Sequence, residues 1–291
     1  MANQLHSSRF KLKPAPEGWG ITAVFEGYQL VFTGSAERKR LRREAWQNLV
    51  AGFGFKTRTS KAEKFLSRID LYALFDQPTK RAWNRACRKA ISRNLPLNFE
   101  DIFLILLKQP EIQMLCGRLN TDPKAAEKFL KNYLLLHRPT PGPEIKELPF
   151  AAFDLALTLR HHKIDSLMLL GGLLAASPKD HVLGAIFSNM GLTLQKLEIL
   201  AAWLLNLPVE FPPRSTAAAA LYCCRQAEAL EEHFGYTFDF PAIETAVQSS
   251  QDYYQDMRHH KALQYLVKAG LLAKSKGVKV ITAKHMREAV I

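Results

Sequence analysis

The side chains with the most obvious chemistry are adjacent histidines and adjacent cysteines. The histidines occur as His161-His162 and His259-His260. Neighbouring residues of a helix point about 100° apart, so neither pair offers two ligands to one metal as an i, i+4 pair would. We therefore interpret these histidines as surface or linker residues and expect no metal site.

The cysteines are also expected to be structural. Cys223-Cys224 lies in the apolar stretch 217–225, where small buried thiols are common. None of the four cysteines belongs to a C-x-x-C motif, which argues against a zinc ribbon, and the adjacent pair does not suit a disulfide framework. A reducing, cytoplasmic location is the simplest expectation. The N-terminus lacks a signal-peptide pattern. The apolar stretches 167–176 and 199–207 are shorter than the ~20 residues of a membrane span, so we expect no membrane-spanning helix.

Nucleotide hydrolysis has a recognisable requirement that this sequence does not meet. An ATPase needs a loop of the form G-x-x-x-x-G-K-[ST], whose amides, lysine and hydroxyl hold phosphates and magnesium. The sequence contains no such loop and no apolar strand ending in Asp-Glu. We expect no catalytic residue, no cofactor and no enzyme activity within residues 1–291. ATP and Mg²⁺ would be involved only if an ATPase module followed Ile291.

Basic residues are unevenly distributed along the chain. The chain has 40 Lys+Arg against 27 Asp+Glu. Residues 1–100 hold 19 and 8 of these, whereas residues 101–291 hold 21 and 19, so the excess is assigned to the first third. A candidate basic patch for nucleic acid, anionic lipid or an acidic partner is formed by Arg38, Lys39, Arg40, Arg42 and Arg43. The alternative is a solvated helix face, because no nucleic-acid motif accompanies the run.

The elements that would position these groups are mostly helices. Residues 19–25 and 28–32 predict a β-hairpin across the two-residue connection Glu26-Gly27. From residue 61 onward, apolar residues recur at three- and four-residue steps, which favours helices. Proline-rich segments at 139–143 and 208–213 predict linkers. The predicted fold class is therefore mainly α with a short hairpin near the N-terminus.

Two of the helical blocks are similar to each other. Residues 99–105 align with residues 164–170 at an offset of 65, and after a six-residue insertion residues 119–122 align with residues 190–193. The first block begins with a helix spaced by Thr79, Ala82, Ala86 and Ala90. Because such a unit cannot bury its apolar face alone, two copies are expected to pack as a pseudo-symmetric pair.

These blocks, residues 79–135 and 149–206, resemble the double repeat of the N-terminal domain of Clp-type AAA+ protein unfoldases. In that family the second helix usually begins with a Glu-His-Leu-Leu-type element, where this chain has Glu100-Asp101-Ile102-Phe103 and Asp165-Ser166-Leu167-Met168. The third block is similar to the small helical lid of the first AAA+ module in the same unfoldases. That likeness is carried by residues 230–236, 241–247, 253–254, 261–263 and 280–282, although the proline that usually precedes Lys261-Ala262 is absent.

The resemblance implies three regions: a basic N-terminal extension (1–75), a Clp N-terminal-like double helical repeat (76–207) and an AAA+ lid-like helical domain (214–291). It implies a non-catalytic chaperone region that serves protein unfolding and proteolysis by recognising client proteins or an adaptor. Contact with a Clp-type protease and self-association through the lid are further implied partners. The chain would be either the N-terminal part of a longer ATPase or a motor-less derivative.

Four phenylalanines at helical spacing are the candidate partner-binding residues: Phe99, Phe103, Phe150 and Phe153. Aromatic residues at this spacing more often belong to a core, and only exposed ones would mark a patch that holds apolar segments. The alternative function is nucleic-acid binding by the basic first third, whose affinity would fall steeply with salt.

Overall fold

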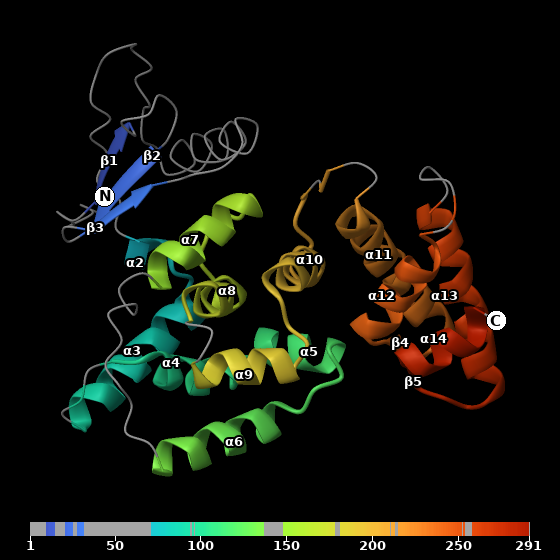
Figure 1. Ribbon diagram of the computed structural model, residues 1–291, viewed down its shortest axis with the longest axis horizontal. Coiled ribbons are helices and arrows are strands. Elements are labelled where there is room, and N and C mark those ends of the chain that lie inside the picture. Colours follow the sequence, from blue (N-terminus) through green and yellow to red (C-terminus); the bar gives the residue numbers. More distant parts are fainter. Residues whose placement is uncertain are drawn as a thin grey trace. The chain divides into compact units, whose positions relative to one another are not determined.

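The structure is a computed structural model that describes residues 10–14, 21–25, 28–31, 71–93, 95, 97–136, 148–177, 181–209, 211–212, 215–251, 253 and 258–290. These residues are mainly helical (Figure 1), which confirms the fold class predicted from the apolar periodicity. The predicted linker at 139–143 and the basic run at 38–43 lie outside the described residues.

The N-terminal part contains a three-stranded antiparallel sheet of order β1-β2-β3. Its strands are β1 (Phe10–Pro14), β2 (Ile21–Phe25) and β3 (Tyr28–Val31). Phe25 is opposite Tyr28, which confirms the hairpin and its two-residue connection. Strand β1, which pairs with β2 from Phe10 opposite Phe25 to Pro14 opposite Ile21, was not predicted.

The first long helix follows the predicted spacing closely. After the short helix α2 (Leu71–Leu74), α3 (Gln77–Ser92) begins behind Asp76, whose Oδ1 accepts the Thr79 amide at 2.7 Å. Such a side-chain cap satisfies an amide that has no partner within the helix. The buried residues of α3 are those of the predicted stripe, namely Thr79, Ala82, Ala86 and Ala90.

Two series of four helices then follow one another. The first consists of α3, α4 (Phe99–Leu106), α5 (Pro110–Arg118) and α6 (Pro123–Leu136). The second consists of α7 (Leu148–Thr158), α8 (Ser166–Ala176), α9 (Val182–Asn189) and α10 (Leu194–Leu204). Helix order therefore agrees with the two blocks that were aligned in the sequence.

The caps of α4 and α8 correct that alignment in detail. Asn98 Oδ1 accepts the Asp101 amide at 2.8 Å, and Asp165 Oδ1 accepts the Leu167 and Met168 amides at 2.8 and 2.9 Å. Asn98 and Asp165 are thus the equivalent residues, so the offset is 67 here and Glu100 is not the counterpart of Asp165. A cap must lie two or three residues before the amide it accepts, and pairing acidic residues by type misses this requirement.

The turns after α5 and α9 agree with the second part of the alignment. Asn120 and Gly191 both have positive φ, of 55° and 62°. In each turn the following amide returns to the helix at 2.9 Å, from Thr121 to the Cys116 carbonyl and from Leu192 to the Phe187 carbonyl. Arg160 and Asn206 adopt the same conformation after α7 and α10, so this helix ending recurs outside the two aligned turns.

The chain forms two compact units, one of Met1–Leu97 with Gly142–Ala176 and one of Asn98–Pro141 with Ser177–Ile291. The first unit contains α3, α7 and α8, with α7 packed along α8. A Cβ on Gly172 would lie 2.8 Å from the Leu148 carbonyl oxygen, so this helix pair approaches more closely than alanine allows. The units group the helices differently from the predicted regions 76–207 and 214–291.

The second unit ends in a helical bundle with a short parallel strand pair at one end (Figure 1). Its elements are α11 (Thr216–Phe234), β4 (Thr237–Phe238), α12 (Phe240–Ser249), α13 (Arg258–Ser275), β5 (Val280–Ile281) and α14 (Ala283–Val290). Gly235 ends α11 at φ 72°, a left-handed conformation that favours glycine. Thr237 is opposite Val280 in the strand pair.

The second predicted linker is packed where the structure describes it. Leu207 and Val209 are buried, and the Leu207 carbonyl accepts Arg225 Nη2 at 2.7 Å. Pro208 follows the end of α10, and its neighbours Leu207 and Val209 are buried within the second unit.

Among the described residues, no helix combines the length and the apolar character required to cross a membrane.

Candidate functional site

The four predicted partner-binding phenylalanines lie in the interior. The exposed fractions of Phe99, Phe103, Phe150 and Phe153 do not exceed 5%. Phe103 packs edge to face on Phe187 with ring centroids 5.4 Å apart. The structure therefore corrects their candidate role: these rings are core residues, because they lie on the helix faces that other helices cover, and they form no exposed patch.

A neighbouring buried carboxylate is also structural. Glu100 is 4% exposed and its Oε1 lies 3.3 Å from His181 Nε2. His181 caps α9 by accepting the Leu183 amide through Nδ1 at 3.3 Å. The pair therefore joins α4 to the start of α9. Its atoms satisfy each other, so we assign it no binding role.

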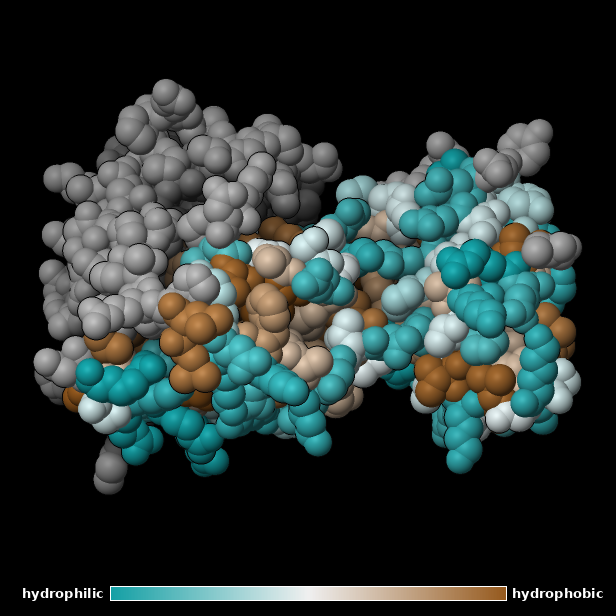
Figure 2. All heavy atoms as spheres, turned by 60° about the horizontal axis from the view of Figure 1, so that its bottom comes forward, coloured by the Kyte–Doolittle hydropathy of each residue, from teal (hydrophilic) through white to brown (hydrophobic). Residues whose placement is uncertain are grey.

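Exposed apolar side chains instead gather on α6. Its buried side is small, since Leu130 is the buried residue of this helix. Phe129, Leu135 and Leu136 are 49%, 84% and 80% exposed. Phe129, Tyr133 and Leu136 fall at i, i+4 and i+7, which places them on one face of the helix. Figure 2 shows such apolar surface as brown patches among hydrophilic atoms.

The position of α6 is fixed by few contacts. Leu130 is fully buried, and Glu127 forms ion pairs with Lys131 at 2.7 Å and Lys108 at 3.6 Å. Lys131 proximity lowers the pKa of Glu127, chiefly through its hydrogen bond. The Lys131 pair lies within the helix, so one side of α6 is held by Leu130 and the Lys108 pair, and Phe129 is open to solvent.

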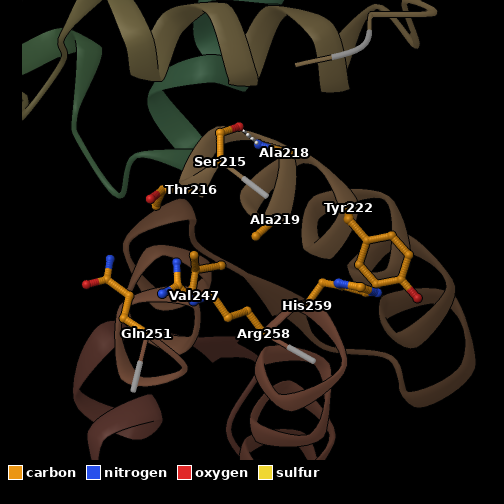
Figure 3. Close-up of a pocket in the computed structure, with 9 residues that line it drawn as sticks. All are labelled: Ser215, Thr216, Ala218, Ala219, Tyr222, Val247, Gln251, Arg258 and His259. Carbon is orange, nitrogen blue, oxygen red and sulfur yellow. Dashed lines mark hydrogen bonds between the residues drawn. The ribbon is translucent and has the colours of Figure 1, made fainter. Parts of the chain in front are cut away.

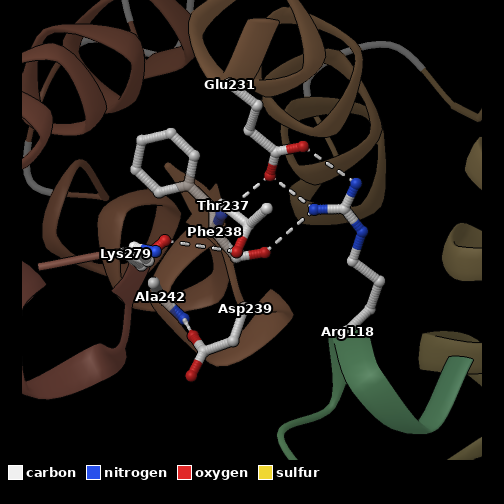
Figure 4. A network of polar contacts seen from close by, with 7 residues as sticks. All are labelled: Arg118, Glu231, Thr237, Phe238, Asp239, Ala242 and Lys279. Atoms are coloured by element: carbon white, nitrogen blue, oxygen red, sulfur yellow. Dashed lines mark hydrogen bonds and ion pairs between the residues drawn. The ribbon is translucent and has the colours of Figure 1, made fainter. Parts of the chain in front are cut away.

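An arginine joins α5 to the C-terminal bundle (Figure 4). Arg118 forms a two-pronged ion pair with Glu231 of α11, in which Nη2 donates to Oε2 at 2.9 Å. Its Nη1 also donates to the Phe238 carbonyl at 3.1 Å, and Phe238 in turn donates its amide to Glu231 Oε1 at 2.7 Å. The guanidinium lies 4.2 Å from the ring centroid of Trp203. This network links α5, α10, α11 and β4 within the second unit.

A pocket of about 180 Å³ lies among the starts of α11 and α13 and the end of α12 (Figure 3). Its polar lining consists of Ser215, Thr216, Tyr222, Gln251, Arg258 and His259. Ser215 Oγ is engaged in capping α11 through the Ala218 amide at 3.1 Å. Cationic and hydroxyl groups suit a small anion, but no carboxylate stands among the described lining residues to act as a base.

No protein-family model, no curated protein and no solved structure matches this chain.

The adjacent cysteines singled out in the sequence lie in inert surroundings. Burial raises the pKa of Cys223 to about 12 and raises that of Cys224 well above the ordinary value. Buried thiols with raised pKa values are poor nucleophiles. His161 Nε2 lies 3.2 Å from Asp165 Oδ2, and the His259 ring packs edge to face on Tyr222 at 5.0 Å. In the part of the chain that the structure describes, no cluster of three or more histidines, cysteines or carboxylates could hold a metal.

Sequence reasoning missed two surface features. The α6 stripe has the same spacing as a core helix, so periodicity alone cannot reveal its exposure. The second feature was hidden by averaging: residues 258–287 contain eight Lys+Arg and no Asp or Glu. Basic character is therefore not confined to the first third, and a shorter counting window would have found it. The candidate patch from Arg38 to Arg43 lies outside the described residues.

Proposed function

We propose that this chain is a non-catalytic protein-recognition region of a Clp-like unfoldase, and that it binds client segments or an adaptor through α6. The observation that carries the proposal is the apolar face of α6, where Phe129, Tyr133 and Leu136 follow one another at helical spacing beside the exposed Leu135. Apolar anchors at i, i+4 and i+7 are the pattern by which helices bind partner proteins.

The Clp-like part of the proposal concerns the two helical series. It holds that α3–α6 and α7–α10 are the two copies of a Clp N-terminal repeat and that α11–α14 is a lid-like bundle. Equal helix order in the two series, and the caps at Asn98 and Asp165, support this assignment. An ATPase module would then be separate from these residues, and the chain alone should not hydrolyse ATP.

The size of the exposed face supports protein binding over binding of a small molecule. Three large side chains that remain about half to four-fifths exposed are spread over two turns of α6 rather than gathered around a cavity. Exposed apolar patches of this kind are typical of protein contact sites. Lysines on the same helix, Lys124, Lys128 and Lys131, would favour clients with acidic flanks.

The test is the affinity of the full chain for a fluorescent, permanently unfolded reporter protein. We expect Leu135→Ser with Leu136→Ser to weaken binding by about tenfold, because the anchor Leu136 and the exposed leucine beside it both lose their apolar contact. Ile91→Ser is the matched control, since Ile91 is 76% exposed on another helix. Unchanged affinity in the α6 variant, with the fold retained by circular dichroism, would reject the proposed site.

A further inference from the structure

Helix α13 has a second surface with its own pattern. One side of the helix is buried against α11, α12 and α14 through Ala262, Leu266, Ala269 and Ala273. On the other side a shallow groove runs along the helix, lined by His260, Leu263, Gln264, Val267, Lys268 and Leu271. These residues form two rows at four-residue spacing, an apolar row (Leu263, Val267, Leu271) and a polar row (His260, Gln264, Lys268). We call them together the α13 groove.

Two parallel rows of side chains on a helix can accept a helix of a partner protein. Side chains at i±4 form ridges on a helix, and the space between neighbouring ridges accepts a ridge of another helix at a crossing angle near −50°. From Leu263 to Leu271 the apolar row extends about 12 Å along the axis. Leu271 is 55% exposed, and Leu263 and Val267 are partly exposed, so solvent reaches all three residues of the row.

The charge around the groove selects the partner. Helix α13 carries Arg258, Lys261, Lys268 and Lys274 and no acidic residue. Within 258–290 the single acidic residue is Glu288, whose Oε2 forms an ion pair with Lys276 Nζ at 2.7 Å. Lys268, in the groove itself, has no ion-pair partner among the described residues. A partner with carboxylates beside its apolar ridge would therefore meet unopposed positive charge.

We propose that the α13 groove docks an acidic amphipathic helix of a partner protein. The apolar row favours a protein helix over nucleic acid, because a phosphate backbone would leave Leu263, Val267 and Leu271 without an apolar contact. Glutamates on the partner would pair with Lys268 and the neighbouring lysines, which would speed association and fix its orientation. This surface is on a different helix from the α6 face, so the two proposals stand or fall separately.

The probe is a fluorescein-labelled synthetic helix of about 18 residues, with leucines at i, i+4 and i+7 and glutamates beside them. We measure its binding to the full chain by fluorescence anisotropy. One control peptide has the same composition in an order that destroys the apolar ridge. A second replaces every glutamate with lysine. We expect only the amphipathic glutamate peptide to bind, with an affinity that falls as salt is raised.

Three variants test whether the peptide binds in the α13 groove. Leu271→Asp and Lys268→Glu should each weaken binding by about tenfold, the first by removing an apolar contact and the second by reversing the groove charge. Lys284→Glu, on the exposed surface of α14, changes charge equally but lies outside the groove lining and should leave affinity nearly unchanged. Because Leu271 and Lys268 are exposed, both variants are expected to keep the fold, which circular dichroism checks.

Several results would overturn the proposal. Absence of binding by the amphipathic peptide would do so, as would equal binding by its reordered control. If a short DNA duplex binds more tightly than the peptide, and Lys268→Glu abolishes that binding, the groove is a nucleic-acid site. Concentration-dependent self-association that is lost in Leu271→Asp would assign it to a second copy of the chain.

Discussion

Arg118 on α5 and Glu231 on α11 are 113 residues apart in the sequence and form a two-pronged ion pair. Both side chains are largely shielded, with 22% and 11% of their surface exposed. Glu231 also accepts the Phe238 amide, so the same carboxylate fixes the start of the strand pair. The pair is therefore the polar link between the first helical series and the C-terminal bundle in the second unit.

Removing the arginine should destabilise this unit. Arg118→Met leaves the shielded Glu231 carboxylate without its main partner, and we expect the free energy of unfolding to fall by about 3 kcal/mol. Arg118→Lys should not restore the lost stability, because an ammonium group cannot form the two-pronged contact with Glu231 and donate to the Phe238 carbonyl at the same time. Urea unfolding followed by circular dichroism measures the change.

Lys276→Met is the matched control, since it breaks the exposed pair with Glu288. Water screens exposed pairs so that they contribute little to stability, and this variant should therefore unfold almost like the parent chain. If the two substitutions lower the free energy of unfolding equally, the Arg118–Glu231 pair contributes no more to stability than an exposed ion pair.

A buried cap gives a pH-dependent prediction. Asp239 is 2% exposed, and burial raises the pKa of its carboxyl, with the Ala242 amide and His285 acting in the opposite direction. A carboxyl with a raised pKa in the folded state holds its proton more tightly there, so its contribution to stability is lost as pH rises through that pKa. Asp239→Asn keeps a good cap without the buried charge.

We expect Asp239→Asn to be more stable than the parent chain at pH 7. The difference should shrink as pH falls toward and below the ordinary aspartate pKa of about 3.9. Thermal unfolding across pH 3–7 measures it. A difference that grows on acidification would show that the carboxylate is stabilised in the fold.

Two glycines allow a direct comparison of packing. A Cβ on Gly270 would lie 1.8 Å from Tyr236 Oη, whereas one on Gly117 would meet no atom within 4 Å. Gly270→Ala should therefore lower stability by about 2 kcal/mol or more through overpacking. Gly117→Ala should be neutral or stabilising by up to about 1 kcal/mol, because alanine favours helix. The midpoints of urea unfolding distinguish the two, and a reversed order would contradict the packing of Tyr236 against α13.

The thiols should differ in reactivity. Cys116, Cys223 and Cys224 are buried, whereas Cys87 is partly exposed. Burial raises the pKa of all four, so even Cys87 should react slowly with an alkylating reagent at pH 8. Mass spectrometry after a short pulse should find label at Cys87 alone, and at all four sites in urea. Early labelling of Cys223 or Cys224 would be inconsistent with the buried helix face of α11.

The sequence predicts some elements well because their pattern is local. Thr79, Ala82, Ala86 and Ala90 lie on one helix face by spacing alone, and the structure buries all four. The hairpin of β2 and β3 follows from a two-residue connection between two β-type runs. Strand β1 offers only five residues, two of them lysines and one a proline, which is too weak a signal without its partner strand.

The candidate site was harder to predict because exposure depends on tertiary packing. Phe103 and Phe129 are both phenylalanines on helices of the first series, yet one is fully buried and the other is half exposed. The contact of Phe187 from α9 with Phe103 is one such tertiary difference. Cap positions such as Asn98 likewise depend on which amides a side chain reaches, not on residue type.

The most direct test of the proposed recognition role is site-specific photo-crosslinking on α6. A photoreactive amino acid replaces Leu136 in one full-length variant and Ile91 in another, and each is exposed to a thermally destabilised client protein. If α6 binds clients, a client adduct forms at position 136 and little or none forms at position 91. Adducts of equal yield at both positions, or at position 91 alone, would contradict recognition of clients by α6.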